Sequence, residues 1–465
     1  MMLVLPPGES PPPCMVEGSG AITPILLDGW SGGAAWAYDI ALPLAAVERS
    51  VDYALGARRF CLTLPARAAG LRVAYAACNG SSDEGPGAPI QVHRNALWRQ
   101  MAAEHARRPF HLLLLGGDQL YADAVWQSVP ALVAWARKPA AARRTARLDA
   151  ADGAAIRAFY RARYAWLWRQ RDIAAMVAAV PTVMMWDDHD IFDGWGSHPP
   201  ELQDGAVHQA IWAAAREAFA LFQRGLSPQA LAPGAAFGWS GRIGPVGIVV
   251  PDLRTERRHD RVLGPRGWGH LATSLDAVRG ARHVLVASSV PVAHVDLSWL
   301  ERLLGALPVV TAFLDDLRDQ WLSPAHAQEW QRLIALLSGH AAAAPLTVVS
   351  GEIHLGALGR IETAGVEIAQ LTASGIAHAA PPRLYALALE LLARRKLDRG
   401  EARVAMLPLP GIGRRFLRAR NWLALDVAAD GGLDAAWHHD GAGPSPVLWR
   451  DARRCGAPRV SAAPA

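Results

Sequence analysis

The stretch FHLLLLGGDQLYAD, from Phe110 to Asp123, decides the fold class of this chain of 465 residues. Its first half is a short apolar run typical of a buried strand, and its second half opens on two glycines and is polar. Similar apolar runs recur between longer segments of helical periodicity, which predicts an α/β layer structure. The other runs are LRVAYAA from Leu71, PTVMMW from Pro181, VGIVVPD from Val246, RHVLVASS from Arg282 and LTVVSG from Leu346.

Segments with the periodicity of helices separate these runs. They are Val92–Arg107, Ala154–Met176, Gly205–Arg224 and Ala327–Leu337. Near the C-terminal end, NWLALDV from Asn421 and LDAAWHH from Leu433 flank an Asp-Gly-Gly sequence, which predicts a β-hairpin.

Residues 1–70 differ in character from the rest. Short apolar pieces (ITPILL, AAWAYDIAL and RRFCLTLP) alternate there with Gly and Pro, as in strands joined by turns. We therefore expect a small β-rich N-terminal domain over 1–70 and a larger domain over 71–465. The small domain could shape a cleft, dock a partner or cover a sheet edge.

Composition excludes several classes of protein. Hydrophobic residues make up 51% and charged residues 19%, as in globular proteins. The net charge of +5 is a small excess, and the arginines lack the interleaved aromatic residues of a nucleic-acid platform. Four scattered cysteines exclude a disulfide framework and a Cys-based zinc site. The chain shows neither a signal-peptide pattern nor an apolar run of the ~20 residues that span a bilayer, so we expect a cytoplasmic protein.

Polar clusters follow directly on the predicted strands, where open α/β sheets collect their ligands. Besides GGDQLYAD, they are ACNGSSDE (Ala77 to Glu84), WDDHDIFDGWG (Trp186 to Gly196), SGEIHLG (Ser350 to Gly356) and LTASGIAH (Leu371 to His378). In GGDQLYAD, Asp118 stands at a strand end, where its carboxylate could bridge two cations or simply cap a turn.

The segment WDDHDIFDGWG concentrates Asp187, Asp188, Asp190 and Asp193 around His189. Like charges this close repel unless something compensates them, and a cation is the usual compensation. An exposed acidic loop is the alternative, against which the large aromatic neighbours argue.

In SGEIHLG, Glu352 and His354 are two residues apart. In an extended conformation both side chains would point to one face of the chain and could bind adjacent metals. Such a pair is weak evidence on its own.

Taken in order, ACNG, GGDQLYAD, WDDHDIFDGWG and SGEIHLG resemble the alkaline phosphatase D (PhoD-like) branch of the calcineurin-like metallophosphoesterases. Supporting stretches are PDLRTER (Pro251 to Arg257), DDLRDQW (Asp315 to Trp321) and QLTASGIAH. The resemblance implies a four-layer α/β/β/α sandwich over residues 71–465. It also implies a cluster of two or more metal ions, Fe³⁺ with Ca²⁺ in this branch, with Zn²⁺ or Mn²⁺ as the alternatives.

The resemblance also implies a role for individual residues. Asp118 would bridge the metals, Asp188 and Glu352 would bind one of them and His354 the other, and His189 would face the phosphate. Cys78 and Tyr121 match iron-binding positions, with Asn79 beside them. Two departures affect the metal: Cys78-Asn79 stands where the superfamily has Asp-x-His, and Glu352 replaces the Asp usual in the branch.

The chemistry expected from these residues is hydrolysis of a small phosphate ester, monoester or diester, by a metal-activated water. Arg254 or Arg257 could hold a phosphate oxygen, although an ion pair with Asp252 or Glu256 explains them equally well. Two rival functions are a scaffold that keeps the fold without turnover and a nuclease-like phosphodiesterase, which would need a continuous basic groove. The sequence leaves the oligomeric state open.

Overall fold

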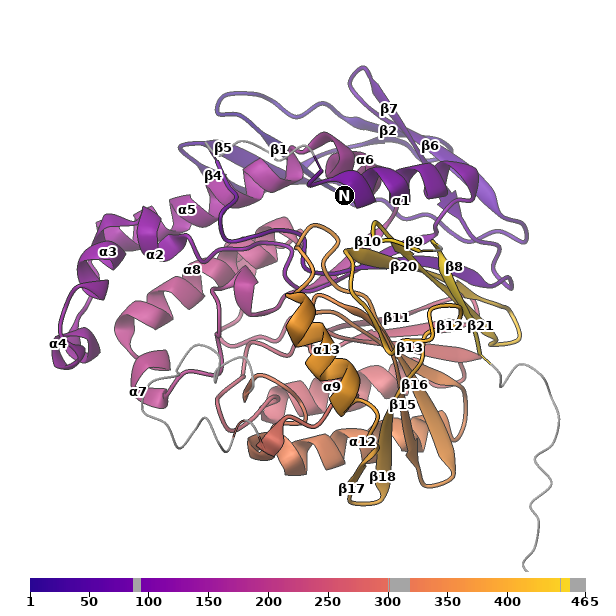
Figure 1. Ribbon diagram of the computed structural model, residues 1–465. Coiled ribbons are helices and arrows are strands. Elements are labelled where there is room, and N and C mark those ends of the chain that lie inside the picture. The colour runs from indigo at the N-terminus through magenta and orange to yellow at the C-terminus, as the bar shows by residue number, and fades with distance from the viewer. Residues whose placement is uncertain (87–92, 300, 302–317, 444, 452–465) are drawn as a thin grey trace, which may run out of the picture.

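The computed structural model describes residues 1–86, 93–299, 301, 318–443 and 445–451 (Figure 1). Two β-sheets lie face to face in the middle of the molecule, and helices cover the outer face of each. This is the four-layer sandwich that the sequence led us to expect.

The first sheet contains the strand that follows Phe110. Its strands, in spatial order, are β10 (Thr182–Met185), β9 (Leu112–Gly116), β8 (Leu71–Ala76), β20 (Asn421–Val427), β21 (Leu433–His439) and β22 (Val447–Arg450). Strands β8, β9 and β10 are parallel, so their carboxyl ends lie at one edge. Strands β20 and β21 form the hairpin predicted near the C-terminal end.

The second sheet is larger. Its path runs β11 (Trp239–Ile243), β12 (Val246–Val250), β13 (His283–Ser288), β14 (Leu346–Ser350), β16 (Val366–Thr372), β15 (Gly356–Thr363), β18 (Ala402–Leu407) and β17 (Leu397–Arg399), and β19 (Phe416–Leu417) pairs with β15. Strands β12, β13, β14 and β16 are parallel, and their carboxyl ends carry the remaining polar clusters.

Alternation along β8 explains why this sheet lies in the interior. Val73 and Tyr75 point into the layer between the two sheets, whereas Ala74 and Ala76 point to the helices on the other side. All four are fully buried. A strand that is apolar on both faces must be covered twice, and this requirement produces the four layers.

The helices fall into two groups by the face they cover. On the first sheet lie α1 (Ala96–Arg107), α5 (Ala150–Trp168), α6 (Arg171–Ala179) and α8 (Ala206–Phe222), and on the second lie α9 (Pro265–Ala277) and α12 (Ala327–Ala341). The segment predicted as one helix over Ala154–Met176 is two helices. Gln170 is extended between them, and its side chain accepts a hydrogen bond from Asn95 Nδ2 (2.7 Å).

Shorter helices extend the helical layer of the first sheet. They are α2 (Val125–Ser128), α3 (Pro130–Ala136), α4 (Ala140–Thr145) and α7 (Pro200–Gln203). A separate helix, α13 (Arg383–Leu392), lies on the outside of the molecule (Figure 1). Short 3-10 turns occur at η1 (Asp188–Asp190), η2 (Pro228–Ala230) and η3 (Pro324–His326).

The N-terminal residues form two small antiparallel sheets, as their β-rich pattern predicted. One contains β1 (Met2–Leu5), β5 (Gly33–Ala37) and β4 (Ile25–Trp30), and the other β3 (Gly20–Ile22), β2 (Cys14–Val16), β6 (Arg49–Leu55) and β7 (Arg58–Leu64). Both lie against the helices: Tyr53 Oη donates to the carbonyl of Ala178 (2.6 Å), and Arg161 pairs with Asp28. The region therefore covers a helical layer.

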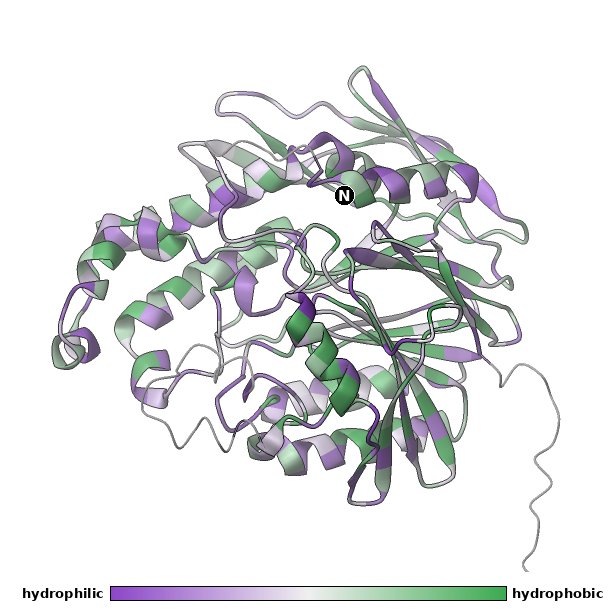
Figure 2. Cartoon of the chain, viewed as in Figure 1, coloured by the Kyte–Doolittle hydropathy of each residue, from purple (hydrophilic) through white to green (hydrophobic). Residues whose placement is uncertain are grey.

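Hydropathy follows this architecture. Hydrophobic residues concentrate on the strands and on the inward faces of the helices, except on α13, which is hydrophobic along much of its length (Figure 2). Among the helices that the structure describes, none combines the length and the apolar character needed to cross a bilayer. Cys14, Cys61 and Cys78 are free thiols, and Cys455 lies outside the described residues.

Candidate metal centre

Loops from both sheets meet where the parallel strands end. Past β8 and β9, the amide of Cys78 donates to the carbonyl of Gly117 (3.2 Å) and that of Asn79 to the carbonyl of Asp118 (2.8 Å). Past the second sheet, the amide of Ile376 donates to the carbonyl of Ala77 (3.1 Å). These backbone hydrogen bonds hold the loops ACNG, GGDQ and LTASGIAH next to one another.

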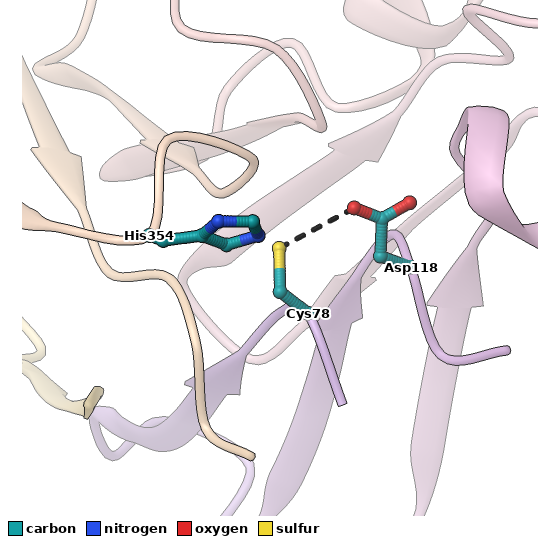
Figure 3. Close-up of side chains that lie close together, drawn as sticks. All are labelled: Cys78, Asp118 and His354. Carbon is teal, nitrogen blue, oxygen red and sulfur yellow. Dashed lines mark hydrogen bonds between the residues drawn. The ribbon is translucent and has the colours of Figure 1, made fainter. Parts of the chain in front are cut away.

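The first group of side chains at this point consists of Cys78, Asp118 and His354 (Figure 3). One ligand atom from each lies within 4.8 Å of the others, and Cys78 Sγ is 3.4 Å from Asp118 Oδ2. The three come from three separate loops. Their thiol, carboxylate and imidazole groups are all metal ligands.

The second group consists of Asp118, Asp188 and His189, again with ligand atoms within 4.8 Å of one another. Asp118 therefore belongs to both groups. It is 1% exposed, and its Oδ1 has no hydrogen-bond partner among the described residues. A buried carboxylate oxygen without a partner is costly, so the observation fits a cation there.

Electrostatics point the same way. Burial, with Asp187 and Asp188 nearby, raises the pKa of Asp118 well above its usual range, against the lowering effect of His189. Burial and the Asp118 carboxylate also raise the pKa of the Cys78 thiol. The pKa of both groups is raised because negative charge is gathered where water is excluded, and a bound cation would compensate that charge.

The backbone at the site is unusual. Cys78 (φ 55°), Asp118 (φ 54°), Glu352 (φ 65°) and His354 (φ 53°) are four of the five non-glycine residues with left-handed φ among those described. Each such residue costs free energy and persists only where its surroundings enforce it. Both residues of the Glu352-x-His354 pair have positive φ, so the extended conformation expected for this segment is wrong.

The pair is consequently divided between two environments. His354 Nε2 is 3.2 Å from Tyr121 Oη and joins the Cys78 group. Glu352 is absent from both groups, and its two carboxylate oxygens accept from Gln320 Nε2 (3.1 Å each). Burial raises the pKa of Glu352 well above its usual range, so this carboxyl also lies in a poorly solvated place.

Aromatic rings form one wall of the site. The Tyr121 ring stacks on His189 (centroids 4.3 Å apart) and His378 (5.4 Å), and His378 stacks on His354 (3.6 Å). Burial and the neighbouring His378 lower the pKa of His354 well below its usual range, which favours the neutral imidazole that a metal needs.

His189 is oriented by a carboxylate. Its Nδ1 is 2.9 Å from Asp123 Oδ2, and Asp123 also accepts from Ser82 Oγ (2.7 Å) and the amide of Asp193 (2.7 Å). Burial disfavours charge on His189, but Asp123, Asp188 and Asp118 together outweigh burial and raise its pKa well above the usual value. This arrangement suits a proton donor that acts through Nε2, which lies 3.9 Å from Asp193 Oδ1.

Arg254 and Arg257 lie behind the site. The Arg254 guanidinium, fully buried, binds Asp187, Asp188 (3.4 Å) and Asp319 (2.6 Å), and Arg257 Nε is 2.9 Å from Asp319. With those contacts made, Arg254 holds the acidic segment in position and has no exposed surface for a phosphate. The partners of its guanidinium are not Asp252 or Glu256, the two alternatives that the sequence offered.

Asn79 is fully buried beside the Cys78 group. Its Oδ1 accepts from Trp98 Nε1 (2.8 Å), while its Nδ2 has no partner among the described residues. Asp190 does not face the site. It accepts from the amides of Leu120 and Asp187 (2.9 Å each) and fixes the loop.

Four residues near the site had no role in our sequence-based prediction: Asp123, Gln320, Ser374 and His378. Ser374 Oγ donates to Cys78 Sγ (3.0 Å). All four belong to stretches that the sequence does mark, namely GGDQLYAD, DDLRDQW and LTASGIAH. Only their contacts, which join segments far apart in the chain, distinguish them from their neighbours.

Comparison with known proteins finds similar chains. Residues 92–312 match the family model described as PhoD related phosphatase. The chain is 24% identical over 396 residues to the uncharacterized protein YGR266W of Saccharomyces cerevisiae, covering 70% of this chain and 56% of the yeast protein. The match thus spans little more than half of the relative's length.

Solved structures extend the likeness to almost the whole chain. The structure of PhoD superposes with a TM-score of 0.59 at 14% identity, covering 97% of this chain and 86% of that one, which shows a shared fold. A purple acid phosphatase from yellow lupin (Lupinus luteus) seeds gives 0.49 at 11% identity, with 97% and 72% covered. The family match covers residues 92–312, so this part of the chain is similar to the PhoD-related phosphatases.

Proposed function

We propose that this protein hydrolyses phosphate esters with the help of bound metal ions. The observation that carries the proposal is Asp118, a buried carboxylate shared by two groups of metal-ligating side chains, with one oxygen that has no partner among the described residues. A carboxylate with an oxygen for each of two cations is what a bridging ligand requires.

Two metal positions follow from the donor atoms. Cys78, Tyr121 and His354 would hold one cation with Asp118, and a thiolate with a phenolate suits Fe³⁺. Asp188 and Glu352 would hold the other with Asp118, and their oxygens suit Ca²⁺. Zn²⁺ and Mn²⁺ are the alternatives. Glu352 would have to exchange its contact with Gln320 for the cation.

When bound, such cations neutralise phosphate oxygens and lower the pKa of water. The chain's own residues would do the rest. His189, held at Nδ1 by Asp123, would keep a proton at Nε2 for the leaving oxygen. Asn79 Nδ2 is a buried donor available to a substrate oxygen. Arg254 would act only by positioning Asp187 and Asp188, and Arg257 by holding Asp319.

The test is the Asp118→Asn variant. Elemental analysis of the variant should find less bound metal than in the wild type. Its rate of hydrolysis of a chromogenic phosphate ester should fall at least about 100-fold, because one bridging oxygen is gone. The matched control is Asp434→Asn at a site distant from the metal centre, which should keep both. Full activity in the Asp118 variant, or metal-free wild-type protein that still turns over, would refute the proposal.

The substrate class needs a second measurement. Turnover of a monoester and a diester on one preparation separates phosphomonoesterase from phosphodiesterase activity. A nuclease-like enzyme would instead show dominant diester turnover that falls steeply with salt. Metal binding without turnover of any ester would favour the scaffold. The cytoplasmic location expected from the sequence stays a prediction.

A further inference from the structure

Helix α13 has an unusual surface. Its sequence, RLYALALELL, contains only two charged residues, Arg383 and Glu390. A surface helix of a globular protein normally has one apolar stripe that faces the core and a polar opposite face. Here both faces are apolar.

The apolar residues on the inner face of α13 pack against the rest of the protein. Ala386 and Leu389 are buried, and Leu389 packs in a small apolar cluster with Leu355 and Phe416. Leu355 directly follows His354, so the helix rests on the loop that carries a candidate metal ligand. The second stripe therefore faces outward without any packing requirement to explain it.

The outer stripe consists of Leu384, Leu387 and Leu391, spaced three and four residues apart. They are 81%, 52% and 61% exposed. Residues at this spacing lie on one side of a helix. Three leucines side by side in water are unfavourable, and a contiguous exposed apolar surface normally marks a contact with a partner or a membrane.

Charge identifies the kind of partner. Arg383 stands at the start of the helix, and Arg394, Arg395 and Lys396 follow its end; all four are exposed. None of them takes part in the ion pairs found among the described residues, whereas the one acidic residue, Glu390, is neutralised by Arg415 (3.2 Å). The apolar stripe is therefore bordered at both ends by positive charge that these ion pairs leave available.

We propose that α13 docks on the surface of an anionic lipid bilayer. The leucines would enter the boundary between headgroups and acyl chains, and the four basic side chains would contact anionic headgroups, as in interfacial amphipathic helices. The helix follows the LTASGIAH segment, whose His378 lines the metal centre, and its inner face touches the His354 loop. Docking would hold the metal centre close to the membrane surface.

Sedimentation with vesicles tests the proposal on the full chain. Wild-type protein should bind vesicles of phosphatidylcholine mixed with phosphatidylserine and should not bind phosphatidylcholine alone. A variant with Leu384, Leu387 and Leu391 all changed to Gln should bind roughly tenfold more weakly or worse. Each of Arg394→Gln, Arg395→Gln and Lys396→Gln should weaken binding about fivefold, and salt should do the same to the wild type.

Two control variants show whether α13 itself is responsible for binding. Leu448→Gln combined with Leu226→Gln removes exposed leucines elsewhere and should not change binding. Asp118→Asn should still sediment, which distinguishes docking by α13 from capture of a phosphate headgroup at the metal centre. The leucine variant should keep the wild-type turnover of a soluble ester, so failure here leaves the proposed catalysis intact.

Three results would overturn the proposal. They are absence of wild-type binding to the anionic vesicles, equal binding by the leucine variant, and a wild-type dimer in light scattering that the leucine variant loses. The last would show that the stripe is a contact between two copies of the chain.

Discussion

His189 depends on one neighbour more than on any other. Asp123 accepts from its Nδ1, and Asp123 itself is held by Ser82 and by a backbone amide. Burial alone would lower the pKa of His189, and the carboxylates reverse that effect. Asp123 is the first of the three carboxylates that raise the pKa of His189, so a single substitution there should lower that pKa.

We predict that Asp123→Asn lowers kcat roughly 10- to 100-fold with a small change in KM, because the imidazole loses its orientation. The pKa of His189 should fall as the negative charge is removed, so activity that requires the protonated imidazole should disappear at a lower pH than in the wild type. A pH-rate profile measures this. Ser82→Ala, which removes one hydrogen bond to Asp123, is the control and should shift the profile little.

The sequence predicted which residues could be metal ligands better than it predicted which of them lie together. Asp118, Cys78 and His354 stand next to predicted strands, so adjacency of their loops could be inferred from the parallel sheet. The division of Glu352 from His354 could not be inferred, because it depends on two left-handed backbone conformations that no pattern of residue types reveals.

Among the elements, the buried arginine that joins the acidic loop to the second sheet stands out. Arg254 follows β12, yet its carboxylate partners are Asp187 and Asp188 after β10 and Asp319 near η3. These contacts hold three segments together with no exposed surface on the arginine. Removing one partner from such a buried network leaves the other charges uncompensated.

We therefore predict that Arg254→Met lowers the free energy of unfolding of the metal-free protein by about 3 to 5 kcal/mol in urea denaturation. The control is Arg258→Met. Its ion pair with Asp204 is partly exposed (2.8 Å), so that variant should change stability by less than about 1 kcal/mol. Equal stability of the two variants would contradict the role given to Arg254.

Elements were predictable where periodicity is strong. The apolar runs became β8, β9, β10, β12, β13 and β14, and Gly205–Arg224 became α8 almost residue for residue. Ala154–Met176 was predicted as one helix because its pattern continues through the break. The break itself lies at Gln170, whose side chain accepts a hydrogen bond from Asn95, the residue before α1. That contact lies outside any local window of sequence.

At the scale of the whole molecule, buried histidines make the free energy of unfolding fall as pH falls. His208 lies among aromatic rings beside Trp126. Burial there lowers its pKa to about 3. A histidine with a lowered folded-state pKa resists protonation. Its stabilising effect is complete above the unfolded value of about 6.5 and is lost as pH falls toward the folded value.

We predict that His208→Phe makes stability less dependent on pH. Between about pH 7 and pH 5 the wild type should lose about 2 kcal/mol more than the variant, as measured by urea denaturation at each pH. Other groups titrate in both proteins alike, so the difference isolates His208. Parallel losses in the two proteins would contradict the prediction.

Four candidate ligands have a left-handed backbone conformation, which makes folding less favourable in free energy before any metal binds. Glycine at Cys78, Asp118, Glu352 or His354 would relieve that strain and end ligation at once. A population of variants selected only for resistance to heat, without metal, should therefore accumulate glycine at these four positions first. Selection for thermal stability alone would therefore remove the residues that we propose as metal ligands.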